Sequence, residues 1–300
     1  MKFYTLDVFT NQPFSGNQLA VFPHVEELSS QKMAKIAKEF NFSETVFVFP
    51  PSNLEANFDV RIFTPAGEIP FAGHPTIGTA FLLAYLGMIH LTGNTTEIIL
   101  QERIGNVPVT IYCQYNEVVS AELTAPNPPK FFSDIPSKLA LAEVLSLSQT
   151  DLSDKYTPRA VSCGLPFLII PVNSLSALNK AQINLISWQK TLSNHIAPHI
   201  YPCYQVDEFE WKVRMFAPAL NITEDPATGS AATAFAAYLA SYQPEINGHW
   251  QWLINQGLEI NRPSKIIASA SKKDNKITEI KVKGESVIIT EGILTINNYN

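Results

Sequence analysis

A gapless internal repeat is the feature that most constrains the fold of this chain. Residues 61–86 read RIFTPAGEIPFAGHPTIGTAFLLAYL, and residues 214–239, which lie 153 positions later, read RMFAPALNITEDPATGSAATAFAAYL. Eight of the 26 aligned positions are identical, and the same offset also aligns Val8, Pro13 and Phe14 with Val161, Pro166 and Phe167. A period near half the chain indicates a duplicated domain, since the repeats of solenoids are only about 20–50 residues long.

The two copies differ most where a predicted strand leads into a predicted helix. Their identical residues lie on both sides of this point: Arg61/Arg214, Phe63/Phe216, Pro65/Pro218, Ala66/Ala219, Ile69/Ile222, Ala84/Ala237, Tyr85/Tyr238 and Leu86/Leu239. Paired segments that share a backbone pattern and differ in chemistry suggest one active site between two halves. The length of 300 residues suits two domains. We expect an N-terminal domain over 1–118 and a C-terminal domain over 119–289, with a strand near 290–300 returning to the first.

Composition and charge exclude several classes of protein. The net charge of −6, without a cluster of basic residues, argues against a nucleic-acid surface. The three cysteines are widely spaced and form no CxxC pair, which argues against a disulfide framework or a zinc knuckle and fits a reducing compartment. No signal peptide is visible, and the longest apolar run, residues 80–89, is about half a bilayer span. We therefore expect a cytoplasmic protein that makes no membrane contact.

Each half contains one helical segment that is apolar nearly all round. These segments are residues 75–86 and 226–242. A helix without a polar face is buried, so the surrounding strands must enclose it. The expected fold is α+β, with two pseudo-symmetric domains, each a curved mixed β-sheet wrapped around a central buried helix. Further helices are expected at 28–40, 137–146 and 183–194; strands are expected at 3–8, 19–22, 45–49, 57–64, 97–101, 106–112, 117–123, 160–161, 167–172, 211–216, 266–270, 277–283, 286–290 and 292–296.

The starts of the two apolar helices are the first candidate site. Gly73 and His74 open one, and residues 225–230 (DPATGS) open the other. A helix N-terminus carries unpaired N–H groups and about half a positive charge, so two such ends facing one cleft would hold a carboxylate. Each residue also has a plainer interpretation: His74 as a capping or core histidine, Asp225 as an N-cap, and Ser230 as a small packing residue.

Glu44 is the second candidate. It lies in the segment FNFSETVFVF, among aromatic and β-branched neighbours. Burial among such residues would raise the pKa of its carboxyl toward the working range of a general base. The alternative is a polar residue at the exposed start of a strand, and the spacing alone favours neither.

Four segments of the sequence resemble a known family, and this resemblance bears on both candidate sites. The segments DVFTNQPFSGNQLAVF, NFSETVFVF, RIFTPAGEIPFAGHPTIGTA and EDPATGSAATAFAAYL resemble the PhzF-like (phenazine biosynthesis) isomerase family, which has the diaminopimelate epimerase fold. The resemblance covers essentially the whole chain. It implies a homodimer without cofactor or metal, in which Glu44 carries a proton between substrate carbons. It also implies that His74, Asp225 and Ser230 surround Glu44, while Gly73 and Gly229 supply backbone donors.

The sequence departs from the cysteine-dependent epimerases and racemases of that fold. Those enzymes use two facing thiols, whereas the matching repeat positions here are Gly73 and Pro226. Cys113, Cys163 and Cys203 lie elsewhere and are expected to be buried apolar residues. We therefore expect a cofactor-independent isomerase that moves a proton within a small carboxylate-bearing metabolite. A non-catalytic small-molecule-binding or interaction protein of the same fold remains the alternative.

Overall fold

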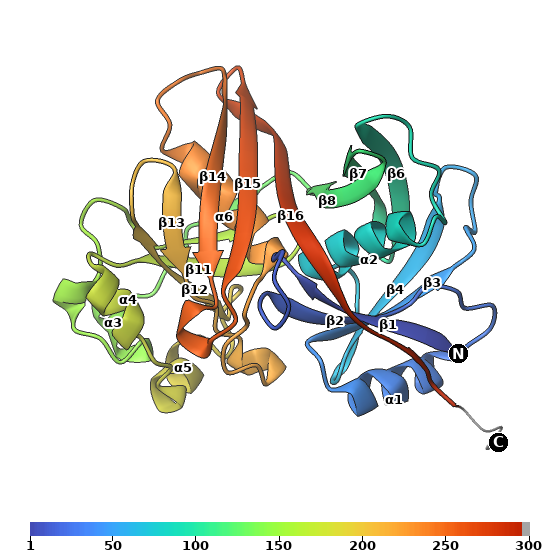
Figure 1. The fold of residues 1–300 in the computed structure, drawn as a ribbon. Coiled ribbons are helices and arrows are strands. Elements are labelled where there is room, and N and C mark those ends of the chain that lie inside the picture. Colours follow the sequence, from blue (N-terminus) through green and yellow to red (C-terminus); the bar gives the residue numbers. More distant parts are fainter. Residues whose placement is uncertain (296–300) are drawn as a thin grey trace. The chain divides into compact units, whose positions relative to one another are not determined.

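The computed structural model describes residues 1–295 and divides them into two compact units (Figure 1). Unit 1 comprises residues 1–126 together with the segment from residue 283 onward, and unit 2 comprises residues 127–282. Residues 296–300, which include the end of the strand expected near 290–300, lie outside the described residues. Each unit is a mixed sheet around a buried helix, so the chain has an α+β fold.

Unit 1 is an eight-stranded, barrel-like sheet. Its pairing order is β1-β2-β3-β4-β6-β7-β8-β16, and β16 also pairs with β1, which closes the ring. The short strand β5 pairs with β4 outside this ring. The elements are β1 Lys2–Val8, β2 Asn17–Phe22, α1 Ser30–Phe40, β3 Glu44–Phe49, β4 Phe58–Thr64, β5 Gly67–Ile69, α2 Gly73–Tyr85, β6 Thr95–Glu102, β7 Gly105–Gln114, β8 Glu117–Thr124 and β16 Lys276–Ile293.

Helix α2 is the core of unit 1. Every residue from Gly73 to Ala84 is buried, as the apolar circumference predicted, and the helix packs against β1, β2, β3, β7 and β8. Helix α1 covers the opposite face of the sheet, where Phe22, Phe47 and Phe63 form an aromatic cluster with it. Because both faces of β3 are covered, residues 45–48 are all buried. Ser29 caps α1 by accepting a hydrogen bond from the Lys32 N–H at 3.3 Å.

Unit 2 uses the same series of strand pairings. Its order is β9-β10-β11-β12-β13-β14-β15-β16, and from β10 to β15 the parallel and antiparallel pairs follow each other as they do from β1 to β7. The elements are β9 Lys130–Phe132, α3 Lys138–Val144, η1 Gln149–Asp151, β10 Arg159–Ser162, β11 Pro166–Pro171, α4 Leu175–Lys180, α5 Leu185–Thr191, β12 His199–Gln205, β13 Glu210–Val213, η2 Pro218–Leu220, α6 Gly229–Ser241, β14 Gly248–Gln256, η3 Leu258–Ile260 and β15 Ser264–Lys273.

Helix α6 occupies in unit 2 the place of α2 in unit 1. Its residues from Gly229 to Ala240 are buried, and it packs against β10, β11, β14 and β15 (Figure 1). The helix begins three residues later than its expected start at Pro226, because residues 225–228 form a turn. The three strands expected between 277 and 296 are one long strand, β16, within the described residues. Strand β13 ends at Val213, three residues before its expected end at Phe216.

The repeated Arg and Phe residues of the two copies make the same contacts. Arg61 binds both carboxylate oxygens of Glu68, at 2.8 and 2.7 Å, and its guanidinium lies 5.3 Å from the centre of the Phe63 ring. Arg214 binds both oxygens of Glu224, at 2.9 and 2.6 Å, and lies 4.9 Å from the Phe216 ring. The repeat therefore preserves a forked ion pair stacked on an aromatic ring.

The two ion pairs differ in burial, and this gives a testable difference in stability. The Arg214 side chain is 8% exposed and the Arg61 side chain is 29% exposed. Arg214→Met would leave the buried Glu224 carboxylate unpaired, so we expect a loss of about 3–5 kcal/mol in the free energy of unfolding. Arg61→Met should cost about 1 kcal/mol, because water reaches the Arg61 side chain and Glu68 keeps an ion pair with Arg103 at 3.0 Å.

Urea unfolding measures both variants. All four tryptophans lie in unit 2, so tryptophan fluorescence follows that unit, while far-ultraviolet circular dichroism follows the whole chain. If Arg214→Met and Arg61→Met lose the same free energy of unfolding, burial does not set the strength of the two ion pairs.

Candidate functional site

In unit 1, Glu44 and His74 face each other. Glu44 is the first residue of β3, and His74 is the second residue of α2. Glu44 Oε2 lies 3.2 Å from His74 Nε2, although the angles between them fall outside those of a hydrogen bond. The side chains are 12% and 5% exposed. Glu44 begins a strand, but its side chain is largely buried there. Gly73 directly precedes His74 at the start of α2.

Two polar residues hold the His74 ring. The Asn17 amide nitrogen lies 3.3 Å from His74 Nδ1, and the Ser43 hydroxyl donates to the Asn17 amide oxygen at 3.3 Å. With that oxygen accepting from Ser43, the Asn17 amide nitrogen faces Nδ1, and the two residues fix the orientation of the ring. Sequence reasoning did not single out Asn17 or Ser43. The one signal was their position, since Ser43 directly precedes Glu44 and Asn17 is the first residue of β2.

His74 is a neutral imidazole. Its complete burial lowers the pKa to about 3, and a hydrogen bond with the Gln18 backbone opposes this only in part. Burial acts this way because the charged form loses its hydration. At neutral pH the ring is therefore uncharged and does not form an ion pair with the Glu44 carboxylate beside it.

A second carboxyl group lies beneath the first turn of α2. The Thr76 hydroxyl donates to Ala72 O at 2.7 Å and also contacts Glu102 Oε1. The single hydroxyl proton of Thr76 is thus shared between two acceptors, the Ala72 carbonyl and the Glu102 carboxyl group. Burial raises the pKa of Glu102 to about 8, against the effect of the Thr76 hydrogen bond. Glu102 is thus a neutral carboxylic acid that supports the helix start carrying His74.

In unit 2, Asp225, Gly229 and Ser230 lie together at the start of α6, and all three are buried. Asp225 is not the N-cap that the sequence suggested, because Thr228 occupies that position. The Asp225 N–H donates to Met215 O at 3.0 Å, and its Oδ2 accepts a hydrogen bond from the Thr228 hydroxyl. The Thr228 hydroxyl, at the N-cap of the helix, therefore helps to hold the carboxylate.

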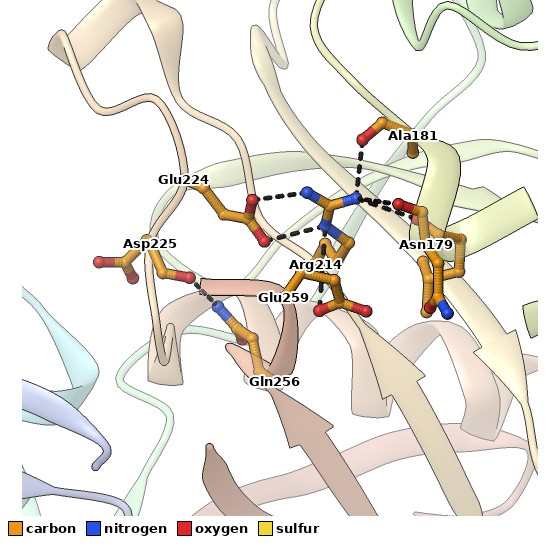
Figure 2. Close-up of polar contacts among 8 residues, drawn as sticks. Asn179, Ala181, Arg214, Glu224, Asp225, Gln256 and Glu259 are labelled. Atoms are coloured by element: carbon orange, nitrogen blue, oxygen red, sulfur yellow. Dashed lines mark hydrogen bonds and ion pairs between the residues drawn. The ribbon is translucent and has the colours of Figure 1, made fainter. Parts of the chain in front are cut away.

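Gln256 holds this turn from the end of β14. Its side chain is fully buried, and its amide nitrogen donates to Asp225 O at 2.8 Å and to Thr228 Oγ1 at 3.0 Å. Its amide oxygen accepts from the Thr228 N–H at 3.2 Å. Figure 2 shows Gln256 below Asp225, and the Arg214–Glu224 pair above Gln256. No sequence signal marks Gln256, because it is an unremarkable strand residue far along the chain.

Arg214 ties the turn to the helices of unit 2. Besides Glu224, which directly precedes Asp225, the guanidinium binds the carbonyl oxygens of Leu178 and Ala181 at 3.1 and 2.7 Å (Figure 2). Glu259 lies 4.0 Å away on its other side. The Asp225 turn is therefore held both by the Arg214–Glu224 ion pair and by the Gln256 amide.

The cysteines lie away from both helix starts, as expected. All three are buried and unpaired by disulfides. Burial raises their pKa values, that of Cys163 to about 12, which keeps each thiol protonated and unreactive at neutral pH. Within residues 1–295 we find no group of three or more His, Cys, Asp or Glu side chains arranged to hold a metal ion. None of the helices described combines the length and apolarity required to traverse a bilayer.

Comparisons with known proteins agree on one family. The model of the family described as phenazine biosynthesis-like proteins matches residues 6–292. An uncharacterised isomerase of Mesorhizobium japonicum is 34% identical over 97% of both chains. Trans-2,3-dihydro-3-hydroxyanthranilate isomerase of Pseudomonas aeruginosa is 33% identical, covering 97% of this chain and 98% of its own. The crystal structure of a Bacillus anthracis phenazine biosynthesis protein of the PhzF family superposes with a TM-score of 0.88 at 25% identity, over 99% of each chain.

The position of Asp225 should depend on Gln256. Gln256→Leu fills a similar volume but leaves the buried Thr228 N–H and Asp225 carbonyl without their partner, at about 1–3 kcal/mol for each unpaired group. We expect the urea midpoint followed by tryptophan fluorescence to fall accordingly. Gln251→Leu, an exposed position on the same strand, is the matched control and should change little. Equal midpoints for wild type and Gln256→Leu would contradict the role assigned to this amide.

The protonated Glu102 should make stability depend on pH. Its folded-state pKa of about 8 exceeds the ordinary value of 4.5, so folding favours the protonated form. This contribution is fully present below about pH 4.5 and is lost as the pH rises to about 8. Glu102→Gln removes this pH-dependent loss of stability and should raise the free energy of unfolding at pH 8 by up to a few kcal/mol.

Urea unfolding between pH 4 and 9, followed by circular dichroism, measures this effect. Glu97→Gln, which replaces an exposed carboxylate on the same strand, is the control. A stability profile of Glu102→Gln parallel to that of wild type would show that Glu102 is ionised in the folded protein.

Proposed function

Because this chain belongs to the family of phenazine biosynthesis-like (PhzF) proteins, we propose that it is an isomerase acting on a small carboxylate-bearing metabolite. The reaction moves a proton between two carbon atoms and uses no cofactor. Relatives covering nearly the whole chain are named isomerases, which supports the reaction class. The observation that carries the proposal is the buried contact between Glu44 and a neutral His74 at 3.2 Å.

Glu44 is the proposed general acid and base. Its carboxylate removes a proton from a carbon that an adjacent unsaturated or carbonyl system makes acidic, and the electron pair shifts along that system. The resulting carboxylic acid then returns the proton to the second carbon, so the enzyme ends the cycle unchanged. A neutral His74 suits this role, because it orients the carboxylate without the strong pairing that an imidazolium would impose on it.

The helix starts are proposed to bind the carboxylate of the substrate. Neither α2 nor α6 has an acidic residue in its first turn, so the positive end of each helix is not neutralised from within. Backbone N–H groups at Gly73 and Gly229 are the proposed donors, and Asp225 and Ser230 are proposed to contact the substrate. This proposal includes the pseudo-symmetric arrangement that the repeat suggests, with one active site served by both units.

We also propose that the protein works as a homodimer in the cytoplasm. The three buried cysteines, none in a disulfide, are compatible with a reducing compartment. Sedimentation equilibrium of the purified chain tests the dimer, and a mass of one chain at micromolar concentration would refute it.

Deuterium exchange tests the isomerase. A panel of unsaturated and hydroxylated small carboxylates, including trans-2,3-dihydro-3-hydroxyanthranilate, is incubated with the protein in D₂O and followed by mass spectrometry. At least one member should incorporate deuterium at carbon, and Glu44→Gln should slow this by about 10²–10⁴-fold, the usual contribution of a general base. Glu39→Gln, an exposed carboxylate of α1, is the control and should exchange at the wild-type rate.

Two results would point elsewhere. If panel members raise the melting temperature but none exchanges, the protein is a ligand-binding protein and not an isomerase. If alkylation of thiols abolishes exchange, the reaction depends on cysteine and Glu44 is not its base.

A further inference from the structure

His199 stands in unit 2 where Glu44 stands in unit 1. The repeat aligns Phe63 of unit 1 with Phe216 of unit 2. Phe63 pairs across the antiparallel strands with Thr45, the residue after Glu44. Phe216 forms an antiparallel bridge with Ile200, through reciprocal hydrogen bonds of 2.9 Å, and Ile200 is the residue after His199. Each is the first residue of a strand that runs parallel to its neighbour.

The alternation of side chains along β12 places His199 on the face of the strand that packs against the central helix, α6. Side chains two residues apart along a strand share a face. The ring of Tyr201, two residues after His199, lies 5.5 Å from the Phe235 ring of α6 in an edge-to-face contact. Glu44 likewise lies on the helix-facing side of β3, where it meets His74 of α2.

The two units therefore carry the same pair of side-chain types with their places exchanged. Unit 1 has a carboxylate at the strand start and an imidazole at the helix start, in Glu44 and His74. Unit 2 has the imidazole at the strand start, in His199, and the carboxylate before the helix, in Asp225. The repeat alone does not reveal the exchange, because His199 lies outside its aligned segments.

The surroundings of the His199 ring favour contact with a ligand. The residue is 6% exposed, and its Nδ1 is buried without a hydrogen-bond partner among residues 1–295. Its ring contact is apolar, with Phe167 at 5.8 Å between centroids. A buried polar atom without a partner destabilises the fold, so its retention calls for a partner that arrives from outside.

We propose that His199 is a substrate-binding residue, whose ring nitrogen Nδ1 forms a hydrogen bond with a polar substituent of the carboxylate substrate. This rests on the proposed function and extends its site in unit 2. The role is binding and not proton donation. Burial lowers the pKa of His199 to about 4, so no imidazolium proton is available at neutral pH.

Two substitutions separate a binding role from a packing role. His199→Phe retains a ring and removes the hydrogen bond, whereas the Asn side chain of His199→Asn places an amide near the position of Nδ1. His249→Phe, at an exposed histidine of the same unit, is the control. Calorimetric titration with 3-hydroxyanthranilate, an aromatic analogue that cannot isomerise, and with each panel carboxylate gives the dissociation constants.

For ligands that bind wild type, His199→Phe should raise the dissociation constant and KM about 5–20-fold, with kcat nearly unchanged, as expected for one lost hydrogen bond. His199→Asn should remain within about threefold of wild type. Nitrogen NMR of wild type should also show the Nδ1 resonance shifting when the ligand is added.

Four outcomes would count against the inference, the isomerase proposal or both. Unchanged binding by His199→Phe would make His199 a packing residue, and a loss confined to kcat would make it a proton carrier. Absence of binding by wild type for every ligand tested would contradict both proposals. Binding that depends on His199, without deuterium exchange by wild type, would refute the isomerase and leave His199 as a binding residue.

Discussion

The burial of two helices without a polar face is the constraint on which the rest of this structure depends. From Gly73 to Ala84 in α2, and from Gly229 to Ala240 in α6, every residue is buried. A flat sheet covers only one side of a helix, so each sheet must curve round it, and in unit 1 the strands close into a ring. The polar groups of the two candidate sites lie mainly at the ends of strands and at the starts of these helices, where the backbone has unpaired groups.

Enclosure also sets the chemistry of the polar groups at those places. The same loss of hydration keeps His74 and His199 neutral and keeps a proton on Glu102. Such groups need fixed partners, and unit 1 supplies amide and hydroxyl groups at Asn17, Ser43 and Thr76. In unit 2 the Asp225 turn is held by the Gln256 amide and by the forked pair of Arg214 with Glu224 (Figure 2).

The sequence predicted the features that depend on local pattern. The apolar helices, the mixed α+β character and the absence of cysteine from the helix starts could all be read from residue order, because hydrophobic periodicity and the repeat are local properties. Predictions from the sequence failed where contacts with distant segments determine the bounds of an element. The start of α6 at Gly229 depends on Gln256, some 30 positions away, and β16 is continuous because neighbouring strands pair with it along its length.

The sequence by itself determined that two helices are buried and predicted a duplicated domain, and by resemblance it named Glu44, His74 and Asp225. The tertiary structure decided which polar groups touch: Glu44 meets His74, Asn17 contacts the His74 ring, and Gln256 holds the Asp225 turn. It also decided that His199 corresponds to Glu44. The physical reason is that a hydrogen bond depends on atoms brought within about 3 Å, and only strand register and helix packing fix that distance between residues far apart in the chain.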